Sequence, residues 1–347
     1  MRILAAAFLM TGLLFPYPWK GKIYRENGFK VVENRGEGIW GKQLASKVKF
    51  TRVLSLGKAE GKDFEIFSSW LGLAVDSEGE ILILDRKRKR LLKFSPEGKP
   101  LWMTGKEGEG PGEFRYPISV SAGPGGTIWV VDAGRFIHRF SSEGKYQDTL
   151  TLDFWVEKVF FLKNGNLLLT LGLRGQHGLK AVFFNRKMKK ISDFPYEYRY
   201  GPELPSGSLV MDKITLSEGR IFFALPDRYE VLIFKEDASP LFIIKRTMPF
   251  KPTTIKPMNG GVNIVTGDEV GPCFSLWGRF FVVFLQKIQK DGSYRSFLDF
   301  YSSDGRFLGS YPLGSSTFLK WVDKRGNFYF LQTYPFPRIY KSRVLIK

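Results

Sequence analysis

Short runs of alternating apolar and polar residues, separated by glycine turns, repeat along most of the chain. Two stretches show the pattern most clearly: LGLAVDSEGEILILDRKRKRLLKFSPEGKPLWMTG from Leu71, and ISVSAGPGGTIWVVDAGRFIHRFSSEGKYQDTLTL from Ile118. In each stretch four apolar runs follow one another, and the second run ends in an aspartate, Asp85 or Asp132. A period of two between glycine turns is typical of short antiparallel strands. Each stretch therefore predicts a unit of four β-strands.

The same unit recurs along the rest of the chain with less regularity. Further copies start at Phe154 and at Asp212, and a fifth copy needs an insertion around Val265–Cys273. A sixth copy, from Phe318, stops after three strands at the C-terminus. Four-stranded sheets that repeat every 40 to 50 residues or so are typical of a β-propeller, where each sheet packs on its neighbours. The pattern therefore predicts six blades, the last of which lacks one strand.

The missing strand has a candidate near the other end of the chain. Val48–Leu56 resembles the fourth strand of a unit, comes before the first complete copy and has no partners of its own. Pairing it with Ile339–Ile346 would join the two ends of the chain and remove two exposed sheet edges. We therefore predict an all-β fold: a six-bladed β-propeller of four-stranded antiparallel blades, closed by an N-terminal strand in the last blade.

The glycine-rich stretch GKEGEGPGEFRYP, residues 105–117, stands between the first two complete units. It is not a phosphate loop of the Walker type, because no Lys-Ser or Lys-Thr pair follows it and three glutamates would repel an anion. We expect it to connect two blades. A G-x-G-P-G-E-F motif within it is formed by Gly108, Gly110, Pro111, Gly112, Glu113 and Phe114.

This motif resembles the connection between repeats in bacterial six-bladed β-propeller proteins with NHL-like repeats. The segment Phe29–Lys42 is similar to the strap that such proteins place before the first blade. The resemblance implies the propeller fold, and it implies export for many members of the family, but it does not imply an activity because a fold hosts many functions.

The chain is expected to have three parts: residues 1–19 as a signal peptide or N-terminal tether, residues 20–46 as the strap, and residues 47–347 as a single propeller domain. Met1–Phe15 has one early arginine followed by apolar and small residues, which is the layout of a secretory signal. No clear Ala-x-Ala cleavage site follows, so an uncleaved membrane tether and a buried N-terminal segment remain open alternatives. We expect an exported protein, periplasmic or extracellular.

The net charge and the small numbers of cysteine and histidine residues limit the kinds of site that the chain can form. The chain of 347 residues has 53 Lys and Arg against 34 Asp and Glu, a formal net charge of +19, which favours anionic partners. A single cysteine, Cys273, excludes an intramolecular disulfide. His138 and His177 have no partner at metal-ligand spacing, and we interpret both as satisfied surface residues. We predict no metal, no cofactor and no catalytic residue. The recurring Asp85 and Asp132 are expected to fix turns.

Topology sorts the cations onto one face. In a four-stranded meander, the turn between the second and third strands and the connection to the next blade emerge on the same side. The predicted second-to-third turns of all blades contain cations, and we take these as candidate binding residues: Arg86, Lys87, Arg88, Lys89, Arg90, Arg135, Arg174, Lys180, Arg228, Lys287, Lys290 and Arg338. The connections return acids to the face, so a charge pattern kept for solubility is an open alternative.

Three functions are compatible with these observations. The first is an exported, non-enzymatic binding scaffold, monomeric and possibly tethered, whose loop face engages a protein or an anionic polymer or surface. The second, implied by related propellers, is a metal-dependent lyase or lactonase acting in the central channel. The third is RNA binding, which the charge favours and the signal-like segment disfavours, so that nucleic acid is not the expected partner.

Overall fold

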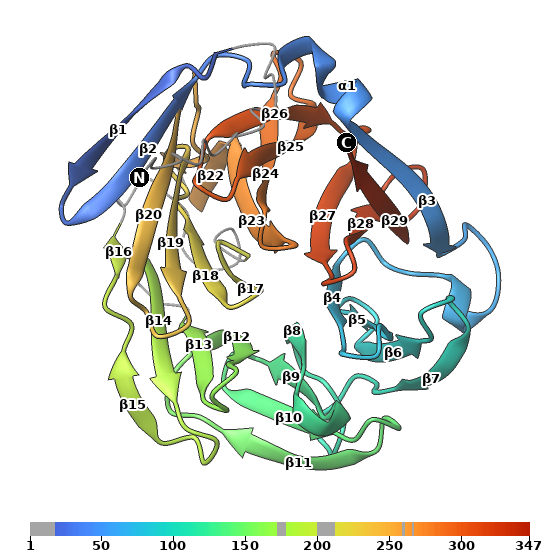
Figure 1. Cartoon of the computed structure of the whole chain (residues 1–347). Helices are drawn as coiled ribbons and strands as arrows, with labels where there is room; N and C mark the ends of the chain where they lie inside the picture. Colours follow the sequence, from blue (N-terminus) through green and yellow to red (C-terminus); the bar gives the residue numbers. More distant parts are fainter. Residues whose placement is uncertain (1–17, 172–177, 200–211, 259–260, 266) are drawn as a thin grey trace, which may run out of the picture.

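The computed structural model describes residues 18–171, 178–199, 212–258, 261–265 and 267–347. Six antiparallel sheets are arranged around a central axis (Figure 1), so the predicted propeller is confirmed. The strands of blades 1 to 3 are β4 (Leu71–Val75), β5 (Ile81–Asp85), β6 (Arg90–Phe94), β7 (Pro100–Thr104); β8 (Pro117–Ala122), β9 (Ile128–Asp132), β10 (Phe136–Phe140), β11 (Tyr146–Thr151); and β12 (Val156–Phe161), β13 (Leu167–Leu171), β14 (Gly178–Phe184), β15 (Lys190–Asp193), with β16 (Tyr198–Arg199) beside β14.

Blades 4 to 6 follow in chain order around the ring. Their strands are β17 (Ile214–Ser217), β18 (Arg220–Ala224), β19 (Glu230–Lys235), β20 (Pro240–Thr247); β23 (Glu269–Leu276), β24 (Phe280–Ile288), β25 (Tyr294–Ser302), β26 (Phe307–Pro312); and β27 (Thr317–Val322), β28 (Asn327–Gln332), β29 (Arg338–Ile346), β3 (Val48–Leu56). The first strand of each blade lies nearest the axis in Figure 1.

The N-terminal strand closes the ring as predicted. Strand β3 pairs antiparallel with β29, from Leu56 opposite Ile339 to Val48 opposite Ile346. Figure 1 shows the two strands side by side, with the C-terminus at the end of β29. Because an unpaired outer strand would leave a row of backbone donors and acceptors open, this pairing completes the last sheet.

A hairpin before the ring was not predicted as a strand pair. Strand β1 (Gly21–Glu26) pairs with β2 (Phe29–Arg35), and β2 pairs in parallel with β20, so blade 4 becomes a six-stranded sheet. Val31 and Val32 are fully buried there. The segment predicted as a strap therefore covers an edge of blade 4. It continues through η1 (Gly41–Gln43) and α1 (Leu44–Lys47) to β3.

The insertion in blade 5 lies earlier than the sequence pattern placed it. The extra residues form the hairpin of β21 (Thr254–Met258) and β22 (Gly261–Val265), whereas Glu269–Cys273 belongs to the innermost strand β23. A Gly-Pro pair normally argues against a strand interior. Here the pairing register shifts between Val270 and Cys273, and such a bulge accommodates the proline.

The glycine-rich stretch connects β7 to β8, as predicted. Phe114 is fully buried in it, and the Glu113 carboxylate accepts a hydrogen bond from the Gly110 N–H at 2.9 Å. A Cβ on Gly105 would stand 2.3 Å from the Phe114 ring, and the φ of Gly105 is +88°, so only glycine fits. The loop thus satisfies its own donors and anchors one blade against the next.

The core lies between neighbouring blades. Between blades 1 and 2, for example, Leu82 and Leu84 pack against Val120 and Val130, and all four are buried. Because each sheet is covered on both sides, its strands are apolar over most of their length rather than strictly alternating. Packing of this kind fixes the position of each innermost strand relative to the channel.

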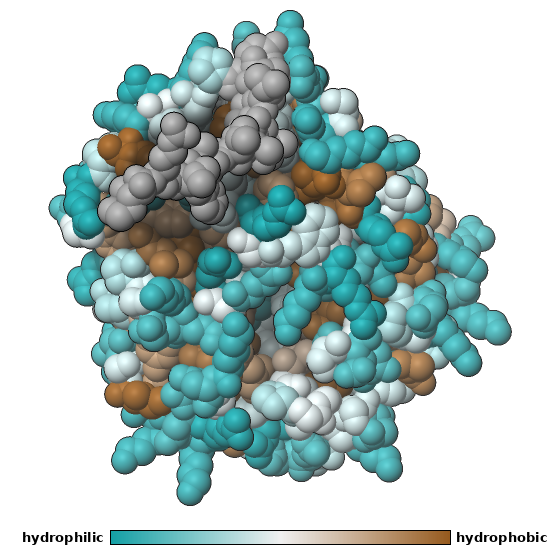
Figure 2. Space-filling model, viewed as in Figure 1, coloured by the Kyte–Doolittle hydropathy of each residue, from teal (hydrophilic) through white to brown (hydrophobic). Residues whose placement is uncertain are grey.

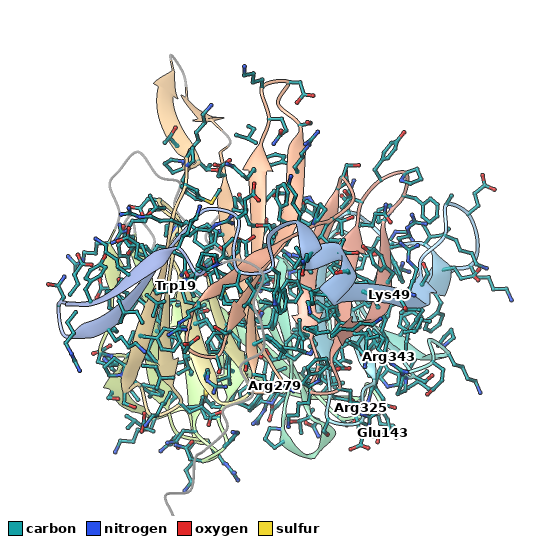
Figure 3. All side chains as sticks on the ribbon, turned by 45° about the horizontal axis from the view of Figure 1, so that its top comes forward. Trp19, Lys49, Glu143, Arg279, Arg325 and Arg343 are labelled. Atoms are coloured by element: carbon teal, nitrogen blue, oxygen red, sulfur yellow. The ribbon has the colours of Figure 1, made fainter. Side chains whose placement is uncertain are left out.

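The two faces of the ring differ in the turns they carry. We call the face with the second-to-third turns and the inter-blade connections the connection face, and the other the opposite face. In Figure 3, Glu143, Arg279 and Arg325, which lie in turns of the opposite face, are on the lower side, while the β24–β25 and β21–β22 hairpins project from the upper side. Figure 2 views the opposite face, where hydrophilic residues predominate among scattered hydrophobic ones.

Candidate functional site

A cavity of about 270 Å³ lies at the axis of the ring, lined by residues from all six blades. The lining comes mainly from the first residues of the innermost strands, such as Leu71, Ile118 and Phe318, and from the ends of the second strands. Both kinds of position lie at the connection face. We call this cavity the channel mouth.

Asp212 occupies the centre of the charge pattern at the channel mouth. Its carboxylate lies 3.3 Å from the Lys158 ammonium of blade 3 and 3.5 Å from the Lys320 ammonium of blade 6. Burial disfavours the charged carboxylate, but the two ammonium groups outweigh burial and hold the pKa of Asp212 well below its usual range. Asp212 therefore remains ionised and links three blades at the channel mouth.

Lys213 adds a buried cation next to Asp212. Its side chain is almost inaccessible, and its ammonium donates a hydrogen bond to the Val270 carbonyl at 2.8 Å. Within the described ranges, no ion pair joins Lys213 to a carboxylate. Burial lowers the pKa of Lys213 from its usual value, and the negative charges of Glu269 and Asp212 oppose that shift. A buried ammonium without a paired carboxylate is a favourable place for an anion.

Glu157 lines the same cavity with an altered acidity. Burial raises the pKa of its carboxyl to about 7, and the neighbouring negative charge of Asp212 raises it further in the same direction. Near neutral pH the group is therefore divided between its neutral and charged forms. A titration of this residue changes the net charge at the channel mouth by one unit.

Two of the cations predicted from the turns also line the channel mouth. Arg86 follows β5 and donates from Nε to the Pro117 carbonyl at 3.0 Å, and burial lowers its pKa while the charge of Asp212 opposes this. Lys180 lies on β14, 3.6 Å from Asp193. Among the described lining residues, five cationic side chains thus face three carboxyl groups, Glu157, Asp212 and Glu269. The channel mouth is positively charged on balance.

The run Arg86–Arg90 does not form one exposed cluster. Arg90 begins β6, is buried, and lies 3.6 Å from the fully buried Asp85. Lys89 donates to the Arg115 carbonyl and lies 3.6 Å from Glu107. The side chains of Lys87 and Arg88 are exposed. The fold thus engages Arg86, Lys89 and Arg90 with backbone carbonyls or acids, and it leaves Lys87 and Arg88 at the surface.

The remaining predicted cations are distributed around the connection face. Arg135 donates to the Leu152 carbonyl at 3.3 Å, and Arg228 lies 3.1 Å from both Asp227 and Glu230. Lys287 donates to the Pro249 carbonyl, Arg338 donates to Gln332, and Lys290 is exposed. Arg174 lies outside the described residues. Of the predicted cations that the structure describes, Arg86 and Lys180 alone line the channel mouth.

His138 is buried rather than exposed, contrary to the surface position expected for it. One ring nitrogen lies 2.7 Å from the Thr149 hydroxyl and the other lies 3.4 Å from Asp132. The Asp132 carboxylate also accepts hydrogen bonds from the backbone N–H groups of Arg115 and Tyr116, so it holds the connection that leads into its blade rather than the turn expected for it. His177 lies outside the described residues. Over the described ranges, no group of three or more His, Cys, Asp or Glu side chains could hold a metal ion.

Sequence reasoning missed most of the channel mouth. Lys158, Lys213 and Lys320 come from three units, far apart in the chain, and none belongs to a second-to-third turn. One signal could have found them: each stands at or near the start of an innermost strand, in VEKV, MDKI and FLKW. Because every innermost strand begins at the same end of the channel, lysines near the starts of these strands lie around one cavity.

The N-terminal apolar run, residues 1–15, falls in the part that the structure does not describe. Among the helices of the described residues, none has the length and apolar character needed to cross a membrane.

Known proteins support the fold. Residues 69–201 match the family model described as "6-bladed beta-propeller" (DUF5128). A segment of 111 residues is 32% identical to "NHL repeat-containing protein 3" of Homo sapiens, covering 30% of this chain and 32% of that protein. The match thus spans about a third of the length of this relative.

Solved structures of low sequence identity share the architecture. A "Putative exported protein" from Bacteroides fragilis NCTC 9343 superposes with a TM-score of 0.62 at 14% identity, covering 91% of this chain and 99% of that chain. A member of the duf4221 family from Bacteroides vulgatus atcc 8482 gives a TM-score of 0.59 at 9% identity, covering 87% and 99%. Together with the ring of blades, these matches show that the chain has a six-bladed β-propeller fold, part of which is similar to a protein with NHL repeats.

Proposed function

We propose that this protein is an exported binding propeller that holds an anionic ligand at the channel mouth. The observation that carries the proposal is the convergence of cationic side chains from four blades on one cavity around Asp212. Charges of one sign in a concave, partly buried site attract and retain counter-ions more strongly than the same charges on an open surface.

The chemistry of the site favours binding over turnover. Lys158 and Lys320 already share Asp212, and Lys213 is buried with one carbonyl partner, so an incoming carboxylate, sulfate or phosphate group would gain charge-assisted hydrogen bonds. The export part of the proposal is supported by the signal-like pattern of residues 1–15 and stays a prediction.

A charge-matched comparison tests the proposal. The variant Lys158→Gln/Asp212→Asn/Lys320→Gln removes both ion pairs of Asp212 together, so that none of these three residues keeps a charge without its partner, and it lowers the net charge by the same amount as Lys99→Gln. Lys99 lies exposed in a third-to-fourth turn of the opposite face. On a heparin column, the triple variant should elute at clearly lower salt than Lys99→Gln, since exposed charges act mainly through net charge.

Two controls make the result decisive. Both variants should keep the far-ultraviolet circular dichroism of the parent, so that a loss of retention is not a loss of fold. Equal elution of the triple variant and Lys99→Gln, with both folded, would assign heparin retention to net charge and refute the channel mouth as the binding site.

A further inference from the structure

A second cavity lies on the connection face between blades 1 and 2, beside the channel mouth. It has a volume of about 420 Å³ and is lined by Trp70, Arg86, Lys87, Lys89, Tyr116 and Pro117, together with Ser69. Its volume falls in the range of small-molecule sites. Arg86 lines both this cavity and the channel mouth, so the two are adjoining parts of one surface.

Two large aromatic side chains are left exposed at this cavity. Trp70 is 59% exposed and Tyr116 is 51% exposed, although burial of either ring would stabilise the fold. They occupy equivalent positions, directly before the innermost strands β4 and β8. Exposed aromatic rings gathered at one concave place are typical of a binding site rather than of a core.

The backbone segments that carry these rings are held in place. The Tyr116 N–H donates to Asp132 at 2.5 Å, and in blade 1 the corresponding Asp85 accepts the Ser68 N–H at 3.1 Å, two residues before Trp70. The recurring aspartates thus position the aromatic residues. A surface ordered in advance loses little conformational entropy when a ligand binds.

Cations complete the cavity. The Arg86 guanidinium lies 5.9 Å from the centre of the Trp70 ring and is anchored to the Pro117 carbonyl. Lys87 is exposed, and no ion pair or hydrogen bond within the described ranges involves its ammonium. Acidic side chains of the neighbouring connection, Glu107 and Glu109, are exposed and would repel a continuous chain of phosphates. The fitting ligand has apolar ring faces and a few separated negative groups.

We propose that the cavity formed by Trp70, Tyr116, Arg86 and Lys87 is a binding subsite for an acidic saccharide, a sugar ring bearing a carboxylate or sulfate. The apolar face of a pyranose packs on the aromatic rings, and its acidic group binds the cations. This inference rests on the proposed function and names the class of its ligand. The next acidic sugar of the same saccharide would reach the channel mouth past Arg86.

Titration calorimetry with tetragalacturonate and with a heparin tetrasaccharide tests the subsite. Trp70→Ala and Tyr116→Ala should each weaken binding about tenfold, and Lys87→Gln about threefold. The matched control is Tyr334→Ala, since Tyr334 is an exposed aromatic residue beside blade 6. It should bind as the parent does. A neutral tetrasaccharide, maltotetraose, should bind at least about tenfold more weakly than the acidic ones.

Three results would overturn the inference: unchanged affinity in both aromatic variants, equal affinity for maltotetraose, or tighter binding of tetrathymidylate than of either acidic tetrasaccharide. The heparin column separates this failure from failure of the proposed function. If the channel-mouth triple variant loses heparin retention and the aromatic variants keep their affinity, the channel mouth is supported as a binding site and the saccharide subsite is refuted. If the aromatic variants lose affinity and the triple variant keeps its heparin retention, the subsite is supported and the channel mouth is refuted.

Discussion

Two cationic regions of this propeller differ in how their charges are spaced along the sequence and in how close the charges lie in the fold. The run Arg86–Arg90 places five cations in consecutive positions, yet Arg90 turns into the protein and Lys89 binds a carbonyl. Lys158, Lys213 and Lys320 are separated by whole blades, yet they converge around Asp212. Density of charge along a chain is therefore a poor guide to density of charge in space when a repeat fold brings equivalent positions together.

The sharpest test of this contrast is a pair of substitutions within the run. Arg90→Ser should lower the free energy of unfolding by about 3 kcal/mol, because it leaves the fully buried Asp85 without its cation. Arg88→Ser, at an exposed position two residues earlier, should change the free energy of unfolding by less than about 0.5 kcal/mol. Urea unfolding of the two variants measures both. Similar losses would show that the run acts as one unit.

The next effect concerns the acidity of the channel mouth. Burial raises the pKa of Glu157 from 4.5 to about 7 in the folded protein. Ionisation of this carboxyl therefore destabilises the fold, and the destabilisation grows from about pH 4.5 and is complete above pH 7. Glu157→Gln should therefore be more stable than the parent by about 3 kcal/mol at pH 8, and the difference should disappear below pH 4.5. Thermal unfolding across this pH range measures it, and a difference that does not vary with pH would contradict the shifted pKa.

A smaller effect should appear in affinity. Asp212→Asn frees the ammonium groups of Lys158 and Lys320 from their carboxylate, so an added anion no longer competes with Asp212. The variant should bind inorganic sulfate about fivefold more tightly than the parent at low salt. At high salt the two affinities should differ little, because screening weakens the attraction. Calorimetric titration measures the change. Weaker binding in this variant would mean that Asp212 positions the lysines for the anion instead of competing with it.

Much of the fold could be predicted from the sequence because strands in a propeller repeat with a short, local period. The Gly turns and the connection motif act within a few residues, and Asp85 and Asp132 recur at one place in the unit. This repeat predicted six blades and the pairing of β3 with β29. The errors occurred where local rules compete with tertiary packing. Gly271 and Pro272 look like breakers but lie at a bulge in β23, and the hairpin β1–β2 depends on an edge in another blade.

For this protein, the sequence by itself determined the strand pattern, the closure of the ring and the excess of positive charge, since these follow from periodicity, pairing and composition. Only the tertiary structure decided which charges meet. The sharing of Asp212 by Lys158 and Lys320 and the raised pKa of Glu157 depend on distances between different blades, and the burial of Arg90 depends on how the strands of its own blade pair and pack. The physical reason is that electrostatic energy depends on separation and burial in space, and neither is encoded by the spacing of residues along the chain.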